Sequence, residues 1–222
     1  MKKNQLLMSS LMVLAILFCS DISLASGSDT LVVYASGPTL DEVINADTTS
    51  TGMQAHSVYK LVSLDTTYIF LGAVLPKSSI TVIGVLGSNG RPPCIQPGVL
   101  SDGSIPGNLF NLTKKGLVVK LKNLYVLDMS TNGSYHHPGY DVLVSGDSIK
   151  VYADNVVFDY NHGNVFGYTG NWCDFFITNC KFRNGVDPVT WTDSEILAPL
   201  WPAVPAVDSI VMKYNTIFAC NA

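Results

Sequence analysis

Four segments in the second half of this 222-residue chain share one pattern, in which an asparagine is followed three residues later by a large apolar side chain. The four pairs are Asn123 with Val126, Asn155 with Phe158, Asn179 with Phe182, and Asn215 with Phe218. The position four residues before each asparagine is again apolar, with Val119, Val151, Phe175 and Val211. Such alternation is typical of β-strands with one buried face. The pattern predicts repeated strands that are interrupted at a fixed position.

The asparagine predicts how each interruption is made. Asparagine adopts the left-handed backbone conformation more readily than most residues, so it can bend a strand sharply within one residue. A bend at the same place in every repeat suits a coiled chain, and stacked coils would place the asparagine side chains about 4.8 Å apart. Each amide hydrogen bond would contribute about 1 kcal/mol net. Lys213 departs from the pattern, because the other copies are apolar two residues before the asparagine.

The spacing of the asparagines predicts two insertions. The intervals are 32, 24 and 36 residues, so the first and third coils are longer than the second. We place the additional residues in Ser130 to Asp141 and in Asp187 to Val207, which contains four prolines. Proline cannot donate to a strand ladder, so these stretches should bulge outward as loops. Stacked repeats often place such loops on a binding face.

Upstream of the repeats the sequence predicts one short helix and several strands. Thr39 and Glu42 fit a capping box for a helix from Thr39 to about Ala46. Its apolar residues, which fall on one face, are Leu40, Val43 and Ile44. Predicted strands, rich in β-branched and aromatic residues, are Tyr59–Val62, Thr67–Leu71, Ile80–Ile83 and Leu117–Leu127.

The pattern resembles the right-handed parallel β-helix of the pectate-lyase-like superfold. Phe176 to Asn184, with the sequence FITNCKFRN, is similar to one coil of such proteins. The opening from Thr39 to Gly52, followed by Val58 to Leu61, resembles that of uncharacterised secreted bacterial β-helix proteins. The resemblance covers nearly all of the chain after residue 38 and implies that the short helix caps the N-terminal end of the coil. These motifs are structural and imply no particular activity.

We therefore expect an all-β chain with a signal peptide at 1–25, an N-terminal segment with the capping helix at 26–58, and parallel β-helix coils at 59–222. An antiparallel β-sandwich is the competing fold, since it also has short strands between turns. The chain stops soon after its last predicted strand, where a final coil would leave a sheet edge uncovered. We expect either further coils beyond Ala222 or a partner that covers this end.

The first 25 residues have the features of a secretory signal peptide. Lys2 and Lys3 precede an apolar run from Leu6 to Phe18, and small residues lead to a cleavage site after Ala25. The alternative is a lipoprotein signal that uses Cys19. Without residues 1–25 the chain has 11 basic and 16 acidic residues, a net charge of −5. This acidity argues against nucleic-acid binding, and we expect a secreted or cell-surface bacterial protein without a membrane span after cleavage.

Four cysteines remain after cleavage: Cys94, Cys173, Cys180 and Cys220. In an oxidising compartment they allow three disulfide pairings, and spacing does not choose among them. Buried free thiols are the other interpretation, because cysteine is a common small core residue.

Enzymes with the resembled fold cut acidic polysaccharides, which gives two candidate catalytic residues. Asp159 and Arg183 each lie four residues after a repeat asparagine, so they should be neighbours on adjacent coils. In a calcium-dependent lyase Asp159 would be a calcium ligand and Arg183 the base. The favoured interpretation is an exposed cross-strand ion pair contributing about 0–1 kcal/mol, because a single carboxylate cannot build a calcium site. No cofactor is evident from the sequence, and calcium is expected only if the protein is a lyase.

The predicted loops supply weaker candidates for binding. His136 and His137 lie in the first loop, and with His162 they could meet around a metal ion, although adjacent histidines more often point apart. Aromatic rings that could stack on sugars are Tyr135, Tyr140, Trp191 and Trp201. The sequence thus favours a glycan-associated binding or structural module, in contact with extracellular polysaccharide. A lyase or hydrolase acting on acidic, pectin-like polysaccharide is the alternative.

Overall fold

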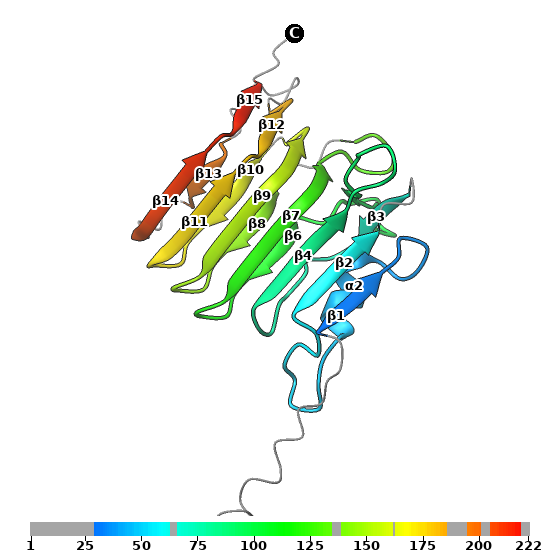
Figure 1. Cartoon of the computed structure of the whole chain (residues 1–222), viewed down its shortest axis with the longest axis horizontal. Coiled ribbons are helices and arrows are strands. Elements are labelled where there is room, and N and C mark those ends of the chain that lie inside the picture. The colour runs from blue at the N-terminus through cyan, green and yellow to red at the C-terminus, as the bar shows by residue number, and fades with distance from the viewer. Residues whose placement is uncertain are drawn as a thin grey trace, which may run out of the picture.

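The computed structural model describes residues 29–62, 66–134, 139–161, 163–185, 195–200 and 205–218. This part of the chain is mostly β-strand, with one short α-helix (Figure 1). The elements are β1 (Thr30–Val33), α2 (Leu40–Ala46), β2 (Val58–Val62), β3 (Thr67–Phe70), β4 (Ile80–Val85), β5 (Cys94–Pro97), β6 (Asn108–Leu112), β7 (Val118–Leu127), β8 (Tyr140–Val144), β9 (Lys150–Asp159), β10 (Asn164–Tyr168), β11 (Cys173–Thr178), β12 (Lys181–Arg183), β13 (Leu197–Pro199), β14 (Val207–Lys213) and β15 (Thr216–Phe218). The strands predicted from the sequence correspond to β2, β3, β4 and β7.

The strands form two sheets whose ladders are all parallel. The larger sheet has the order β1-β2-β4-β7-β9-β11-β14, and β3, β5, β12 and β15 extend it through the later halves of β7 and β9. The smaller sheet has the order β13-β10-β8-β6 and lies behind the larger one in Figure 1. From β6 onward the chain passes repeatedly from one sheet to the other, adding a strand beside an earlier one each time. An antiparallel sandwich is therefore wrong for the described residues.

Three of the four repeat asparagines make the predicted bend. Asn123, Asn155 and Asn179 have φ angles of 53°, 54° and 55°. The Nδ2 of Asn155 donates to Oδ1 of Asn123 at 2.9 Å, which is one rung of the expected ladder. The next rung differs, because Nδ2 of Asn179 donates to Oδ1 of Asp154 at 2.8 Å. A carboxylate accepts more strongly than an amide oxygen.

The fourth bend falls at Tyr214 (φ 59°) and not at Asn215, so the predicted phase of this copy was wrong by one residue. β14 pairs with β11 so that Ile210 and Met212 lie beside Phe175 and Ile177. In this register Ile210 and Met212 continue the apolar column at the end of the stack, where they are 50% and 41% exposed, and Tyr214 falls at the bend. Asn215 instead accepts from the Cys180 N–H at 2.8 Å and donates to the Ile177 carbonyl at 2.9 Å.

The core between the sheets is built from the apolar residues that the alternation predicted. Phe158 and Phe182 stack with ring centroids 5.3 Å apart and an interplanar angle of 7°, and Phe166 of the smaller sheet meets Phe158 edge-on at 5.5 Å. Phe218 does not continue this column, contrary to expectation. It pairs with Arg183 and is 53% exposed, whereas Ile217 lies beside Phe182.

The helix α2 lies at the N-terminal end of the stacked sheets, as predicted for a cap. The Thr39 N–H donates to Oε2 of Glu42 at 2.9 Å, which is one half of the capping box. Leu40 and Ile44 are buried in the common core. Asp41 fastens the helix to the chain after β3, because its Oδ1 accepts from the Leu71 N–H at 3.0 Å.

The predicted loop regions contain regular structure in part. Tyr140 and Asp141 belong to β8, and β13 lies within the stretch from Asp187 to Val207 that was expected to bulge outward. β13 pairs with β10 from Leu197 to Pro199, because even the longest repeat must supply a strand to the smaller sheet.

The described cysteines, Cys94, Cys173 and Cys180, are free thiols, and Cys220 lies outside the described residues. Within the described ranges, no helix has the length and apolar character needed to span a bilayer.

Candidate functional site

Asp159 and Arg183 are neighbours, as the repeat spacing predicted. They are paired in register between β9 and β12, and Nη2 of Arg183 lies 2.7 Å from Oδ2 of Asp159. The Asp159 side chain is only 3% exposed, whereas that of Arg183 is 43% exposed. The carboxylate is therefore buried beneath the guanidinium, and the pair is not a simple surface ion pair.

Two residues that the sequence did not single out complete the environment of Asp159. Tyr125, on β7, donates its hydroxyl to Oδ2 of Asp159 at 2.6 Å. Asn184 donates Nδ2 to Oδ1 at 2.6 Å. The ring of Tyr125 also lies under the Arg183 guanidinium, 5.5 Å from ring centroid to Cζ. The only sequence signal for Tyr125 is its place two residues after the repeat asparagine Asn123.

Both protonatable neighbours of Asp159 retain their protons at neutral pH. Burial, followed by the hydrogen bond to Asp159, raises the pKa of Tyr125 to about 12. Partial burial lowers the pKa of Arg183, but hydrogen bonds to Tyr125 and Asp159 outweigh that effect and raise its pKa overall. A general base must be deprotonated near the working pH before it can accept a proton from the substrate. Because both side chains stay protonated there, neither is suited to act as a base.

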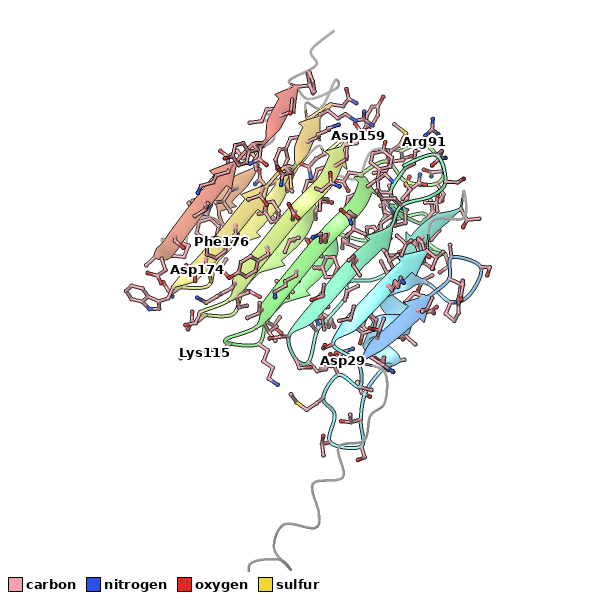
Figure 2. The ribbon with its side chains drawn as sticks, viewed as in Figure 1. Asp29, Arg91, Lys115, Asp159, Asp174 and Phe176 are labelled. Carbon is pink, nitrogen blue, oxygen red and sulfur yellow. The ribbon has the colours of Figure 1, made fainter. Side chains whose placement is uncertain are left out.

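A groove of about 670 Å³ lies on this outer surface of the larger sheet. It crosses the later halves of the long strands, where β3, β5, β7, β9 and β12 lie side by side. The lining residues are Thr66, Thr67, Arg91, Pro92, Cys94, Tyr125, Val157, Lys181 and Arg183. Figure 2 labels Arg91 and Asp159 near the same end of the sheet. The groove is cationic, with three basic side chains on a chain whose net charge is −4.

The floor of the groove is one row of residues in register. The partners across successive strands are Thr67 with Cys94, Cys94 with Tyr125, Tyr125 with Val157, and Val157 with Lys181. Four inter-strand steps of about 4.8 Å give a row of about 19 Å. The groove therefore follows the stacking direction and is long enough for several units of a linear polymer.

Most of the predicted loop candidates lie outside the described residues: Tyr135, His136, His137, His162, Trp191 and Trp201. Tyr140 is the exception. It begins β8, is half-buried, and its ring packs over Gly167 of β10, where a Cβ would overlap it. Tyr140 thus packs within the smaller sheet and is not at a loop tip. In the described ranges, no group of three or more His, Cys, Asp or Glu side chains is arranged to hold a metal ion.

The arrangement can bind anions more readily than it can transfer protons. Arg183 is fixed by Asp159 and by the Tyr125 ring, and planar guanidinium groups bind carboxylates and sulfates through paired hydrogen bonds. Arg91 and Lys181 add two further positive charges to the lining. Searches against family models, curated proteins and solved structures find no match to this chain.

Proposed function

We propose that this chain is an exported right-handed parallel β-helix that binds an extended anionic glycan in the groove lined by Arg91, Lys181 and Arg183. The parallel ladders and the left-handed bends at regular positions support the coil. The signal-like N-terminus supports export to the cell surface or beyond. The observation that carries the function is the guanidinium of Arg183, anchored by Asp159 at the edge of a cationic groove.

A carboxylated or sulfated polysaccharide fits this groove chemically. Thr66, Thr67 and Tyr125 bring hydroxyl groups to a lining that also carries positive charges. Hydroxyls and cations together suit a ligand with both sugar hydroxyls and acidic groups. Because Arg183 is already oriented, little side-chain entropy would be lost when it engages an anion.

The lyase alternative is less well supported. Asp159 accepts hydrogen bonds from Tyr125, Arg183 and Asn184, so a calcium ion would have to displace these donors to use it as a ligand. A base at Arg183 would also have to lose a proton that the same hydrogen bonds stabilise.

Binding should be measured by calorimetry with polygalacturonate, chondroitin sulfate and neutral dextran, for the wild type and for the double variant Arg91→Ala/Lys181→Ala. These residues are preferred because removing Arg183 would leave the buried Asp159 without its cation. We expect binding of the two anionic glycans only, weakened about tenfold or more in the double variant and by added salt. Lys60→Ala, on the exposed surface of β2 outside the groove lining, is the matched control.

Equal binding of dextran, or unchanged affinity in the double variant, would refute the proposal. Appearance of unsaturated products that absorb in the ultraviolet would establish the lyase instead.

A further inference from the structure

A tryptophan occupies a turn at the edge of the larger sheet, away from the groove. Gly116, Ser148 and Trp172 hold equivalent positions in the turns that lead into β7, β9 and β11, as the register of these strands shows. These turns follow one another along one edge of the sheet (Figure 1). Figure 2 labels Lys115 at this edge and Arg91 at the other end of the strands.

The backbone at this turn position is left-handed in all three copies. The φ angles are 75° for Gly116, 56° for Ser148 and 59° for Trp172. Glycine adopts this conformation without strain, whereas a bulky side chain does so only rarely. The hydrogen bond made here comes from the main chain, because the Trp172 N–H donates to the Ala206 carbonyl at 2.6 Å. The fold therefore requires no large side chain at this position.

The indole of Trp172 gains little from packing. The residue is 62% exposed, so burial does not offset the strain of its backbone. A strained residue that the fold does not require points to a function of its side chain. The same turn position with glycine or serine in the two preceding copies shows that the strain is avoidable.

Two polar side chains are fixed beside Trp172. The Asn171 N–H donates to Oδ1 of Asp147 at 2.8 Å, and Oδ1 of Asn171 accepts from the Ala206 N–H at 3.1 Å. Nδ2 of Asn171 makes only a long contact of 3.5 Å with Asp147. Asn171 is exposed and Asp147 is half-buried. An amide donor and a carboxylate acceptor thus lie next to an exposed aromatic ring.

This combination suits a sugar ring better than a protein. Energetically important residues of protein interfaces cluster with other apolar side chains, but the neighbours of Trp172 at this edge are small or polar: Gly116, Ser148, Asp147 and Asn171. A sugar needs one aromatic ring, whose negative face attracts C–H groups, and a few polar groups for its hydroxyls. Asp147 adds a negative charge, which disfavours an acidic sugar.

We propose that Trp172, Asn171 and Asp147 form a binding site for an uncharged β-linked glycan, with one sugar ring lying on the indole. In a β-linked glucan such as cellulose the ring substituents are equatorial, so both faces of each ring present C–H groups. The axial linkages of dextran obstruct one face of each ring. The site is separate from the cationic groove, and it does not rest on the binding of an anionic glycan there.

The test is calorimetric titration of the full chain with cellohexaose and with dextran, together with thermal unfolding. The wild type should bind cellohexaose in preference to dextran. Trp172→Gly should weaken this binding at least about tenfold. It should also raise the unfolding midpoint by about 2–4 °C, because glycine adopts the left-handed conformation without strain.

Tyr214→Gly is the matched control. Tyr214 is also an exposed aromatic residue with a left-handed backbone (φ 59°), but it lies at the last bend of the larger sheet. This variant should keep the affinity for cellohexaose. Arg91→Ala/Lys181→Ala should keep it as well, which separates this site from the groove.

Three results would overturn the proposal: no preference of the wild type for cellohexaose, unchanged affinity in Trp172→Gly, or a lower unfolding midpoint in Trp172→Gly. The last result would show that the indole stabilises the fold. Trp172→Asn, in which the side chain tolerates the left-handed conformation, keeps the binding test decisive if Trp172→Gly does not fold.

Discussion

Asn155 donates its side-chain amide to that of Asn123, 32 residues earlier, at 2.9 Å, and both residues adopt the left-handed conformation at the same point of adjacent parallel strands. The backbone bend and the side-chain hydrogen bond depend on the same residue type. A glycine at position 155 would remove the hydrogen bond and keep the bend, whereas an alanine would remove the hydrogen bond and also disfavour the bend.

We predict that Asn155→Ala lowers the free energy of unfolding by about 2–3 kcal/mol. About 1–2 kcal/mol comes from placing a Cβ-bearing residue without a local hydrogen bond in the left-handed region, and about 1 kcal/mol from the lost amide contact. Asn155→Gly keeps the bend, so it should cost only about 1 kcal/mol. Urea denaturation of both variants measures the difference, and equal losses would contradict a role for the bend.

Phe158 contacts two other rings of the core: it stacks on Phe182 and meets Phe166 edge-on. Phe158→Ala should destabilise the protein by about 3–5 kcal/mol, because the cavity lies between two sheets that cannot collapse freely. Phe176 stacks on Tyr152 at 4.6 Å but lies on the outer face of the larger sheet. Phe176→Ala is the matched control and should cost about 1 kcal/mol or less, so a similar loss for the two variants would be inconsistent with this core.

Gly84 of β4 lies against the bend of the next strand in the sheet. A Cβ at this position would overlap the carbonyl oxygen of Asn123 and the ring of Pro93. We expect Gly84→Ala to cost about 1–3 kcal/mol, since backbone and a proline ring yield little. Gly107→Ala, where a Cβ meets no atom within 4 Å, should be nearly neutral. Calorimetric unfolding of the two variants makes the comparison, and a neutral Gly84→Ala would show that the strands are not packed this closely.

The Tyr125 hydroxyl should ionise at a higher pH than that of an ordinary tyrosine. Its pKa in the folded protein is about 12, against about 10 in an unfolded chain, so the folded state holds this proton more tightly. The corresponding stability is complete below pH 10 and is lost as the pH rises through 12. Ultraviolet titration of the phenolate, taken as the difference between wild type and Tyr125→Phe, should show one group titrating near pH 12. A difference curve centred near pH 10 would mean that Tyr125 does not donate to Asp159.

The described thiols should react slowly in the native protein. Burial raises the pKa of Cys94 and of Cys180 to about 11, so at pH 8 about one thiol in a thousand is ionised. In a Cys19→Ser/Cys220→Ser background, native labelling by a disulfide reagent should be at least about 10²-fold slower than labelling in guanidinium chloride. Rapid native reaction of one thiol would place it in a more polar environment.

The amino-acid sequence by itself determined the features that depend on local chemistry. The bends at Asn123, Asn155 and Asn179 follow from the conformational freedom of asparagine, and the capped helix α2 follows from Thr39 and Glu42. The sequence also predicted that Asp159 and Arg183 are neighbours, because in stacked repeats residues at an equal offset from the bend lie side by side.

The tertiary structure alone decided which residues surround these positions. Tyr125 reaches Asp159 across 34 residues, and Asp128, Asp141 and Asn161 meet in a buried cluster. The last bend passes to Tyr214 because β14 pairs with β11 in a register that places Ile210 and Met212 beside Phe175 and Ile177. Local sequence patterns specify backbone conformation and the face on which a side chain lies. Burial, hydrogen-bond partners and register at an irregular repeat depend on contacts between distant segments, and these exist only once the strands are stacked.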